Sequence, residues 1–113
     1  MANLPGLIEL TKETELLSEV LAQLEKDLGD SHQELVSLRN SNVEQVVETI
    51  ADFLWELYSR SQQNLFNLFY RIDLPEDKVQ ELLRSDGFEW NALAELILKR
   101  ELQKVILRRR FSK

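Results

Sequence analysis

Residues 43–72 read VEQVVETIADFLWELYSRSQQNLFNLFYRI, and this stretch decides the fold that the sequence predicts. Its apolar residues recur at steps of three and four, which places them on one side of an α-helix. Ser41 precedes the stretch and Glu44 follows three residues later, a spacing typical of an N-terminal capping box. No Gly or Pro interrupts this stretch, and the first one after it is Pro75. The stretch therefore predicts one continuous helix, roughly 45 Å long at 1.5 Å per residue.

A narrower apolar pattern precedes this stretch, between residues 8 and 39. Positions alternating four and three apart form a seam in which seven of nine residues are leucine, as in helical hairpins and coiled coils. Gly29 lies between two positions of the seam. The helix therefore either continues through Gly29 at a cost of about 1 kcal/mol or restarts at Ser31. The unbroken register favours one long helix. A turn at residues 40–42 then makes the two arms an antiparallel hairpin.

Two further helices are expected after the hairpin. Pro75 followed by acidic residues is typical of a helix N-terminus and predicts a helix over 75–84. Gly87 indicates a loop, after which apolar residues recur on most sides of a helix predicted over 89–110. Because this last helix is apolar on more than one side, we expect it to be covered on more than one side.

The composition indicates a single helical domain over residues 1–113. Hydrophobic residues make up 43% and charged residues 30%, with only 3 Gly and 2 Pro, so few and long elements are expected. The predicted fold class is all-α: a long antiparallel helical hairpin (arms 8–39 and 43–72) with two additional C-terminal helices, forming a helical bundle. The sequence contains no Cys and no apolar run of the roughly 20 residues that cross a bilayer. With no signal-peptide pattern at the start, we expect a cytoplasmic location.

The net charge of −6 conceals a gradient along the chain. Residues 1–56 hold 12 acids and 3 bases, whereas residues 57–113 hold 8 acids and 11 bases. Four acids recur every four residues on the second arm, and we name them the acidic ladder: Glu44, Glu48, Asp52 and Glu56. Three bases recur in the same way on the last helix, and we name them the basic ladder: Arg100, Lys104 and Arg108. Complementary ladders favour docking of two helices, within one chain or between two.

Three aromatic side chains lie away from the main apolar side of the second arm. Trp55, Phe66 and Tyr70 project about 100° or more from its centre, at 3.6 residues per turn. They form a second apolar side, and we expect the short C-terminal helices to cover part of it and a partner protein the rest. Aromatic side chains are common anchors of protein interfaces, so we interpret all three as candidate interaction residues.

Catalysis receives little support from the residues. His32 is the one histidine, and no phosphate-binding loop, nucleophile elbow or HExxH motif occurs. A di-iron site on the acidic ladder is disfavoured because such sites use Glu-x-x-His pairs. We therefore expect no catalytic residue, no metal and no cofactor. The acidic ladder is better explained as a solvated face.

The function expected from the sequence is that of a non-enzymatic adaptor or scaffold that acts through helix–helix contacts. We expect a homodimer in which the acidic ladder of one copy faces the basic ladder of the other. The alternative is a nucleic-acid-binding regulator that uses the basic C-terminal helix and tail, including Arg109 and Arg110. A sequence pI near 4.8 disfavours that alternative.

Two residues sit at unusual places in the predicted pattern. Ser61 lies on the midline of the second arm's apolar side, where we expect Ser61→Ala to be neutral or mildly stabilising. Glu101 lies within an apolar arc of the last helix, so its carboxylate must find a partner. We expect that partner to be Arg60 or Arg71, at the end of the second arm.

Overall fold

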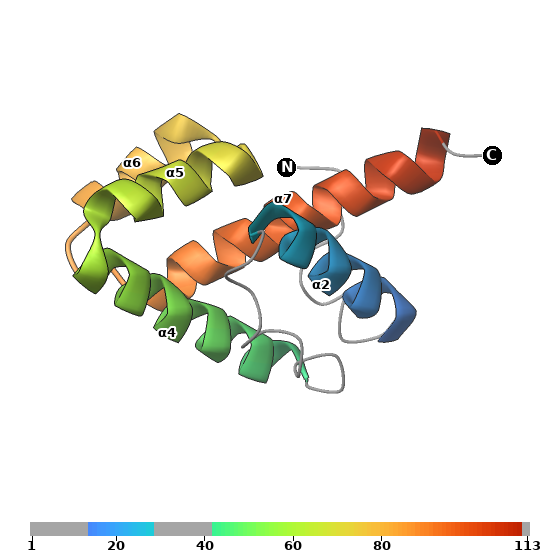
Figure 1. Ribbon diagram of the computed structural model, residues 1–113, viewed down its shortest axis with the longest axis horizontal. Helices are drawn as coiled ribbons and strands as arrows, with labels where there is room; N and C mark the ends of the chain where they lie inside the picture. The colour runs from blue at the N-terminus through green and yellow to red at the C-terminus, as the bar shows by residue number, and fades with distance from the viewer. Residues whose placement is uncertain (1–13, 29–41, 112–113) are drawn as a thin grey trace.

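The computed structural model describes residues 14–28 and 42–111, and this part of the chain is helical with short connections (Figure 1). Its helices are α2 (Thr14–Leu28), α4 (Val43–Arg60), α5 (Gln62–Ile72), α6 (Glu76–Arg84) and α7 (Trp90–Phe111). The predicted fold class, an all-α helical bundle, is confirmed. The continuation of the first arm through Gly29 lies outside the described residues, as do its segments 8–13 and 29–39.

The longest helix, α7, organises the bundle. Both α2 and α4 pack more extensively on α7 than on each other, and α5 and α6 also contact it. Figure 1 shows α7 running through the molecule, with α2 crossing near its middle. A helix that is apolar on most sides takes neighbours on most sides, whereas α4 has one main apolar side to bury. The predicted hairpin arms are therefore held through α7 rather than mainly by each other.

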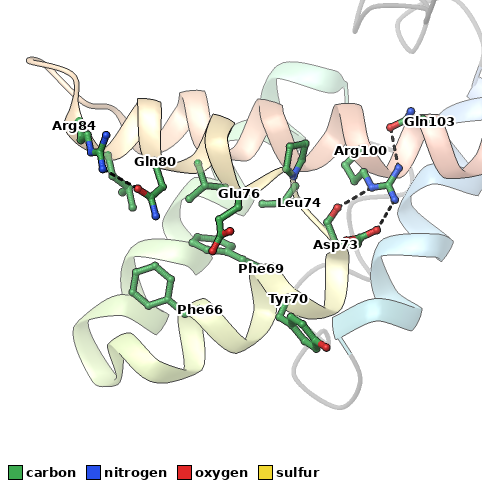
Figure 2. A pocket seen from close by; sticks show the side chains of 13 residues that line it. Phe66, Phe69, Tyr70, Asp73, Leu74, Glu76, Gln80, Arg84, Arg100 and Gln103 are labelled. Carbon is green, nitrogen blue, oxygen red and sulfur yellow. Dashed lines mark hydrogen bonds and ion pairs between the residues drawn. The ribbon is translucent and has the colours of Figure 1, made fainter.

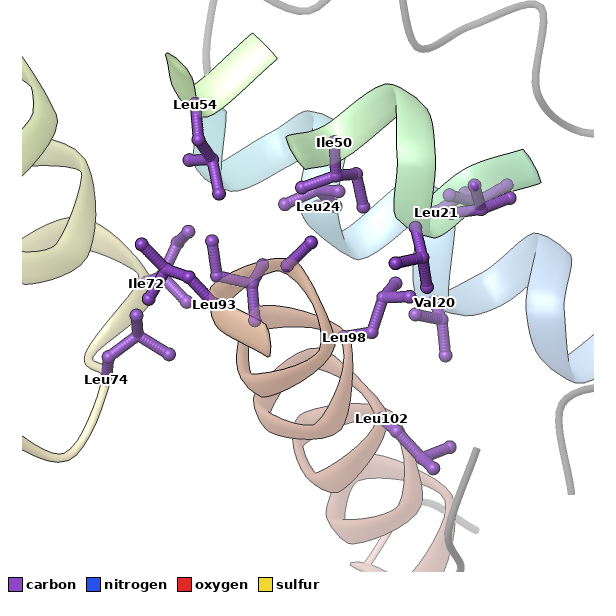
Figure 3. Packing of buried hydrophobic residues seen from close by; sticks show 14 of the residues in the cluster. Val20, Leu21, Leu24, Ile50, Leu54, Ile72, Leu74, Leu93, Leu98 and Leu102 are labelled. Atoms are coloured by element: carbon purple, nitrogen blue, oxygen red, sulfur yellow. The ribbon is translucent and has the colours of Figure 1, made fainter. Parts of the chain in front are cut away.

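One hydrophobic core joins the helices (Figure 3). Ile72 from α5 lies beside Leu93 at the start of α7, and all side chains of this contact are fully buried. Val20 from α2 lies beside Leu98 further along α7, and both are also fully buried. Burying a leucine or isoleucine side chain contributes about 1.5–3 kcal/mol. Among the described residues no helix is both long enough and apolar enough to cross a membrane.

The predicted continuous helix over 43–72 is wrong, because the helix breaks at Ser61. The N–H of Ser61 donates to the Leu57 carbonyl oxygen at 2.9 Å and ends α4, with an extended backbone at φ −164° and ψ 111°. The Ser61 hydroxyl then accepts a hydrogen bond from the Asn64 N–H at 3.2 Å and begins α5. Apolar periodicity did not reveal this break because the apolar spacing continues across it.

The start of α4 differs from the predicted capping box by one residue. The side chain of Asn42 accepts a hydrogen bond from the Gln45 N–H at 2.8 Å. In return, the Gln45 side chain accepts one from the Asn42 N–H at 3.1 Å. The capping box of α4 is therefore formed by Asn42 and Gln45, one residue after the predicted pair, and the predicted Ser41 lies outside the described residues.

The break reverses our expectation for Ser61→Ala. Since the Ser61 hydroxyl caps α5, its removal leaves the Asn64 N–H without that acceptor, and we expect a loss of about 0.5–2 kcal/mol of unfolding free energy. Ser61→Asn, which keeps an N-capping side chain, should lose much less. Ser59→Ala, at an exposed site of α4, is the control. Urea unfolding measures all three, and an unchanged stability of Ser61→Ala would contradict the capping role.

Candidate interaction groove

A short turn connects α5 to α6 and sets their relative placement. Asp73 adopts the left-handed conformation (φ 64°), which aspartate tolerates better than most residues, and ends α5. Its N–H donates to the Tyr70 carbonyl at 3.1 Å, and the N–H of Leu74 donates to the Phe69 carbonyl at 3.1 Å. Leu74 is buried, and Pro75 occupies the N-cap position of α6 without a side-chain capping hydrogen bond. The turn thus anchors α6 beside α5 through one buried leucine.

A groove of about 910 Å³ lies between α5 and α6 (Figure 2). Although the two helices are neighbours in sequence, α6 packs chiefly on α7, and α5 packs chiefly on α4 and α2. The buried floor of the groove consists of Phe69, Leu74 and Val79. Its walls carry three exposed large apolar side chains: Phe66, Tyr70 and Leu83.

The three wall side chains are unusually exposed for large apolar residues. Phe66 is 46% exposed, Leu83 is 41% exposed and Tyr70 is 87% exposed. The Phe66 ring meets the Phe69 ring edge to face, with centroids 5.7 Å apart, so the packed Phe69 supports Phe66 as a wall. Single exposed apolar residues are ordinary, but a group of them around one apolar floor indicates a contact surface.

The groove also has charged side chains at its edge. Arg100 of α7 donates to the Asp73 carbonyl oxygen at 3.0 Å and pairs with the Asp73 carboxylate at 2.9 Å. Arg84 donates to the neutral Gln80 side chain at 3.0 Å. Within the described part of the chain, Glu76 has no hydrogen bond or ion pair. Asp73 and Arg100 are therefore neutralised by each other, whereas no oppositely charged side chain of residues 14–28 and 42–111 pairs with Glu76 or Arg84.

The predicted aromatic residues do not share one surface. Phe66 and Tyr70 line the groove, while Trp55 on α4 is 54% exposed and lies outside it. The α6 side of the groove was missed, because three turns of helix with a few apolar residues were expected only to cover the second arm. The available signal in the sequence was the adjacent pair Leu82 and Leu83, which project about 100° apart and so do not share one side of the helix.

A second aromatic group was also missed. Tyr58 lies 5.5 Å from Trp90 between ring centroids, and Phe88 lies 5.2 Å from Trp90. These contacts join the end of α4 to the start of α7. They serve packing, since Phe88 and Trp90 are partly buried against the core.

The acidic ladder stays on the surface of α4. Glu44, Glu48, Asp52 and Glu56 are all exposed, and Glu56 contacts Arg60 at 3.5 Å. Residues 14–28 and 42–111 contain no group of three or more side chains able to hold a metal ion. The ladder does not meet α7's basic ladder within the chain.

The basic ladder binds other partners in the same chain. Lys104 pairs with Asp27 of α2 at 2.7 Å, in addition to the Arg100–Asp73 contact described above. Arg108 donates to the Gln23 side chain of α2 at 2.7 Å. Two of the three bases therefore contact α2, Lys104 through an ion pair and Arg108 through a neutral glutamine, whereas Arg100 contacts the end of α5.

The next arginine along α7, Arg109, also contacts α2. Arg109 forms an ion pair with Glu19, and its hydrogen bond holds the pKa of the Glu19 carboxyl below its usual range. Arg110 is exposed. Of the basic C-terminal residues predicted to bind a partner, Arg108 and Arg109 are thus engaged by α2.

Glu101 is completely buried, and its predicted partners were wrong. Neither Arg60 nor Arg71 reaches it; Arg60 contacts Glu56 instead. The carboxyl of Glu101 lies beside Asp27, and Lys104 Nζ is 3.1 Å from its Oε1. Sequence periodicity placed Glu101 in the apolar arc, but only the packing of α2 on α7 brings Asp27 to it.

Burial determines the protonation of this cluster. Removal from water, a hydrogen bond to Asp27 and the negative charge of Asp27 together raise the pKa of Glu101 to about 8, although Lys104 opposes them. Apart from Lys104 Nζ, 3.1 Å from Oε1, no donor among the described residues reaches the Glu101 carboxyl oxygens. The neutral form instead donates to the Asp27 carboxylate.

Asp27 shifts in the opposite direction. Burial raises its pKa, but hydrogen bonds from Glu101, Lys104 and Gln23, together with the Lys104 charge, hold the pKa below its usual 3.8. At neutral pH the cluster therefore holds a neutral Glu101 beside an ionised Asp27. It forms a buried polar contact between α2 and α7.

Comparisons of the chain with protein-family models, curated protein sequences and solved structures give no match.

Proposed function

We propose that this protein is a non-enzymatic adaptor or scaffold that binds a helix in the groove between α5 and α6. The observation that carries the proposal is the set of exposed walls, Phe66, Tyr70 and Leu83, around an apolar floor. An amphipathic helix presents apolar side chains at i, i+3 or i+4, and i+7 to such a groove. The nine residues of α6 span about 13 Å, enough for two turns of a docked helix.

A small-molecule site is a weaker explanation of the groove. Its volume of about 910 Å³ falls within the usual range for ligand sites, about 300–1,000 Å³. Such sites bury most of the ligand, whereas the Tyr70 wall is itself 87% exposed. An open apolar surface of this kind is better suited to a protein partner.

The nucleic-acid alternative receives less support. Arg108 and Arg109 are held by side chains of α2, so a phosphate would have to compete with those contacts. A cytoplasmic location remains our expectation, and the absence of Cys is compatible with it.

The test is a selection of displayed amphipathic helical peptides on the wild-type protein. We expect enrichment of peptides with apolar residues at i, i+3 or i+4, and i+7. Phe66→Glu should weaken their binding by at least about tenfold, since central aromatic residues dominate interface energy. Trp55→Glu is the matched control, because Trp55 is similarly exposed but lies outside the groove. Peptides that bind equally to the Phe66 variant, or no enrichment at all, would refute the proposal.

A further inference from the structure

The charged side chains of α6 at the groove are complementary to those of a second, antiparallel copy of α6. Glu76 is in the first turn of α6 and Arg84 is in its last turn, separated by about 12 Å along the axis. Gln80 lies midway between them, and all three line the groove. Because their spacing is four and four, they project from the same side of the helix. This side of α6 is therefore acidic at one end, neutral in the middle and basic at the other end.

Two copies of α6 that are related by a two-fold axis can form two ion pairs. When two copies of α6 run antiparallel with Gln80 near the axis, Glu76 of each copy faces Arg84 of the other. The two Gln80 side chains then meet, and an amide both donates and accepts hydrogen bonds. The Arg84–Gln80 contact within one chain is exposed, so it exchanges readily with water or a new partner.

The same geometry buries the exposed apolar side chains. Leu83 and Phe66 stand at the walls of the groove that Arg84 also lines, and both remain more than two-fifths exposed in the isolated chain. Antiparallel pairing carries the Leu83 side chain of each copy towards the groove of the other. Exposed apolar walls and self-complementary charges thus belong to one surface.

We propose that the helix bound in the groove is α6 of a second copy of this chain, forming a two-fold antiparallel dimer with reciprocal Glu76–Arg84 pairs. This inference rests on the proposed function and names its partner. It replaces the dimer expected from the ladders, because Arg100, Lys104 and Arg108 are engaged within the chain. The surface of α4 does not suit a two-fold pairing, since its acidic ladder would face an identical acidic ladder.

The test uses two charge reversals in the full chain, Glu76→Arg and Arg84→Glu, with sedimentation in about 0.15 M salt, where distant charges are screened. The wild type should sediment at about twice the chain mass of 13.3 kDa at micromolar concentration. Each variant alone places like charges at both contacts and should dimerise at least about tenfold more weakly. An equal mixture of the two variants should regain dimers, because each supplies the charge that the other lacks at both contacts.

Three controls accompany the mixture. Glu81→Arg makes the same charge change on the side of α6 away from the groove and should leave the dimer unchanged. The double variant E76R/R84E should dimerise by itself, because its charges are exchanged. Circular dichroism of each variant establishes that the helices are retained.

The outcomes separate this inference from the proposed function. A monomeric wild type, dimers insensitive to both reversals, or a mixture that fails to recover dimers would each overturn the α6 pairing. The peptide selection judges the groove independently, because its readout is a peptide sequence rather than self-association. Peptide binding that depends on Phe66 in a monomeric protein would keep the proposed function and remove the second copy as the partner.

Discussion

Raising the pH from 5 to 9 is expected to lower the free energy of unfolding by a few kcal/mol through Glu101. Its pKa is about 8 in the folded protein, against a usual value of 4.5. Between these two values the folded protein binds more protons than the unfolded chain, so stability falls as pH rises. The contribution of Glu101 is complete below about 4.5 and is lost as the pH passes through about 8.

The substitution Glu101→Gln isolates this effect. A glutamine amide resembles the neutral carboxyl and still donates to Asp27, so the variant should be close to wild-type stability at pH 5 and more stable than wild type at pH 9. Urea unfolding at pH 5, 7 and 9 measures the difference. Glu95→Gln, at an exposed position of α7, should leave the pH dependence unchanged. A wild type with the same stability at pH 5 and 9 would show that Glu101 is not protonated at neutral pH.

Protonation of Asp27 is expected to lower the free energy of unfolding at acidic pH. Its pKa is lowered in the folded protein, so its contribution is present above its usual pKa of 3.8 and is lost as the pH falls through the lower folded value. The stabilising contribution of Glu101 is thus lost as the pH rises, whereas that of Asp27 is lost as the pH falls. The contact between α2 and α7 should contribute most between about pH 4 and 5.

Leu98→Ala is expected to lower the free energy of unfolding by about 2–5 kcal/mol. Leu98 is fully buried at the centre of α7, where Figure 3 shows it near Val20 of α2 and below Ile50 of α4. Truncation leaves a cavity that helices held on several sides cannot close. Urea unfolding at pH 7 measures the loss.

The control for this core substitution lies on the same helix. Leu107 is 40% exposed, so Leu107→Ala removes the same atoms from a site where water replaces them. It should cost less than about 1 kcal/mol. Equal losses from the two substitutions would mean that α7 is not the centre of the bundle.

Local patterns predicted a large part of the fold. Apolar spacing and turn residues predicted helices over 75–84 and 89–110, close to the observed Glu76–Arg84 and Trp90–Phe111. The apolar residues on most sides of the last helix predicted cover on several sides, which α2, α4, α5 and α6 supply. These features are visible in the sequence because helical periodicity relates residues only three or four positions apart.

The same local reasoning failed where two local conformations compete. A serine inside a helix either bonds back to an earlier carbonyl or caps the next turn. The apolar spacing is identical in both cases, so the sequence did not distinguish a continuous helix from a break at Ser61. Packing decided in favour of the break, because it lets α5 contact α2 and α7 as well as α4.

In the candidate site, too, the sequence determined some features and the tertiary structure decided the others. The sequence by itself identified Phe66 and Tyr70 as apolar side chains away from the main core face, and Glu101 as a carboxylate in an apolar arc. Only the tertiary structure placed Leu83 opposite Phe66 and brought Asp27 to Glu101. Such pairings join residues 17 and 74 positions apart. They depend on which helix faces meet, and that is decided by the burial of the whole core rather than by any local spacing.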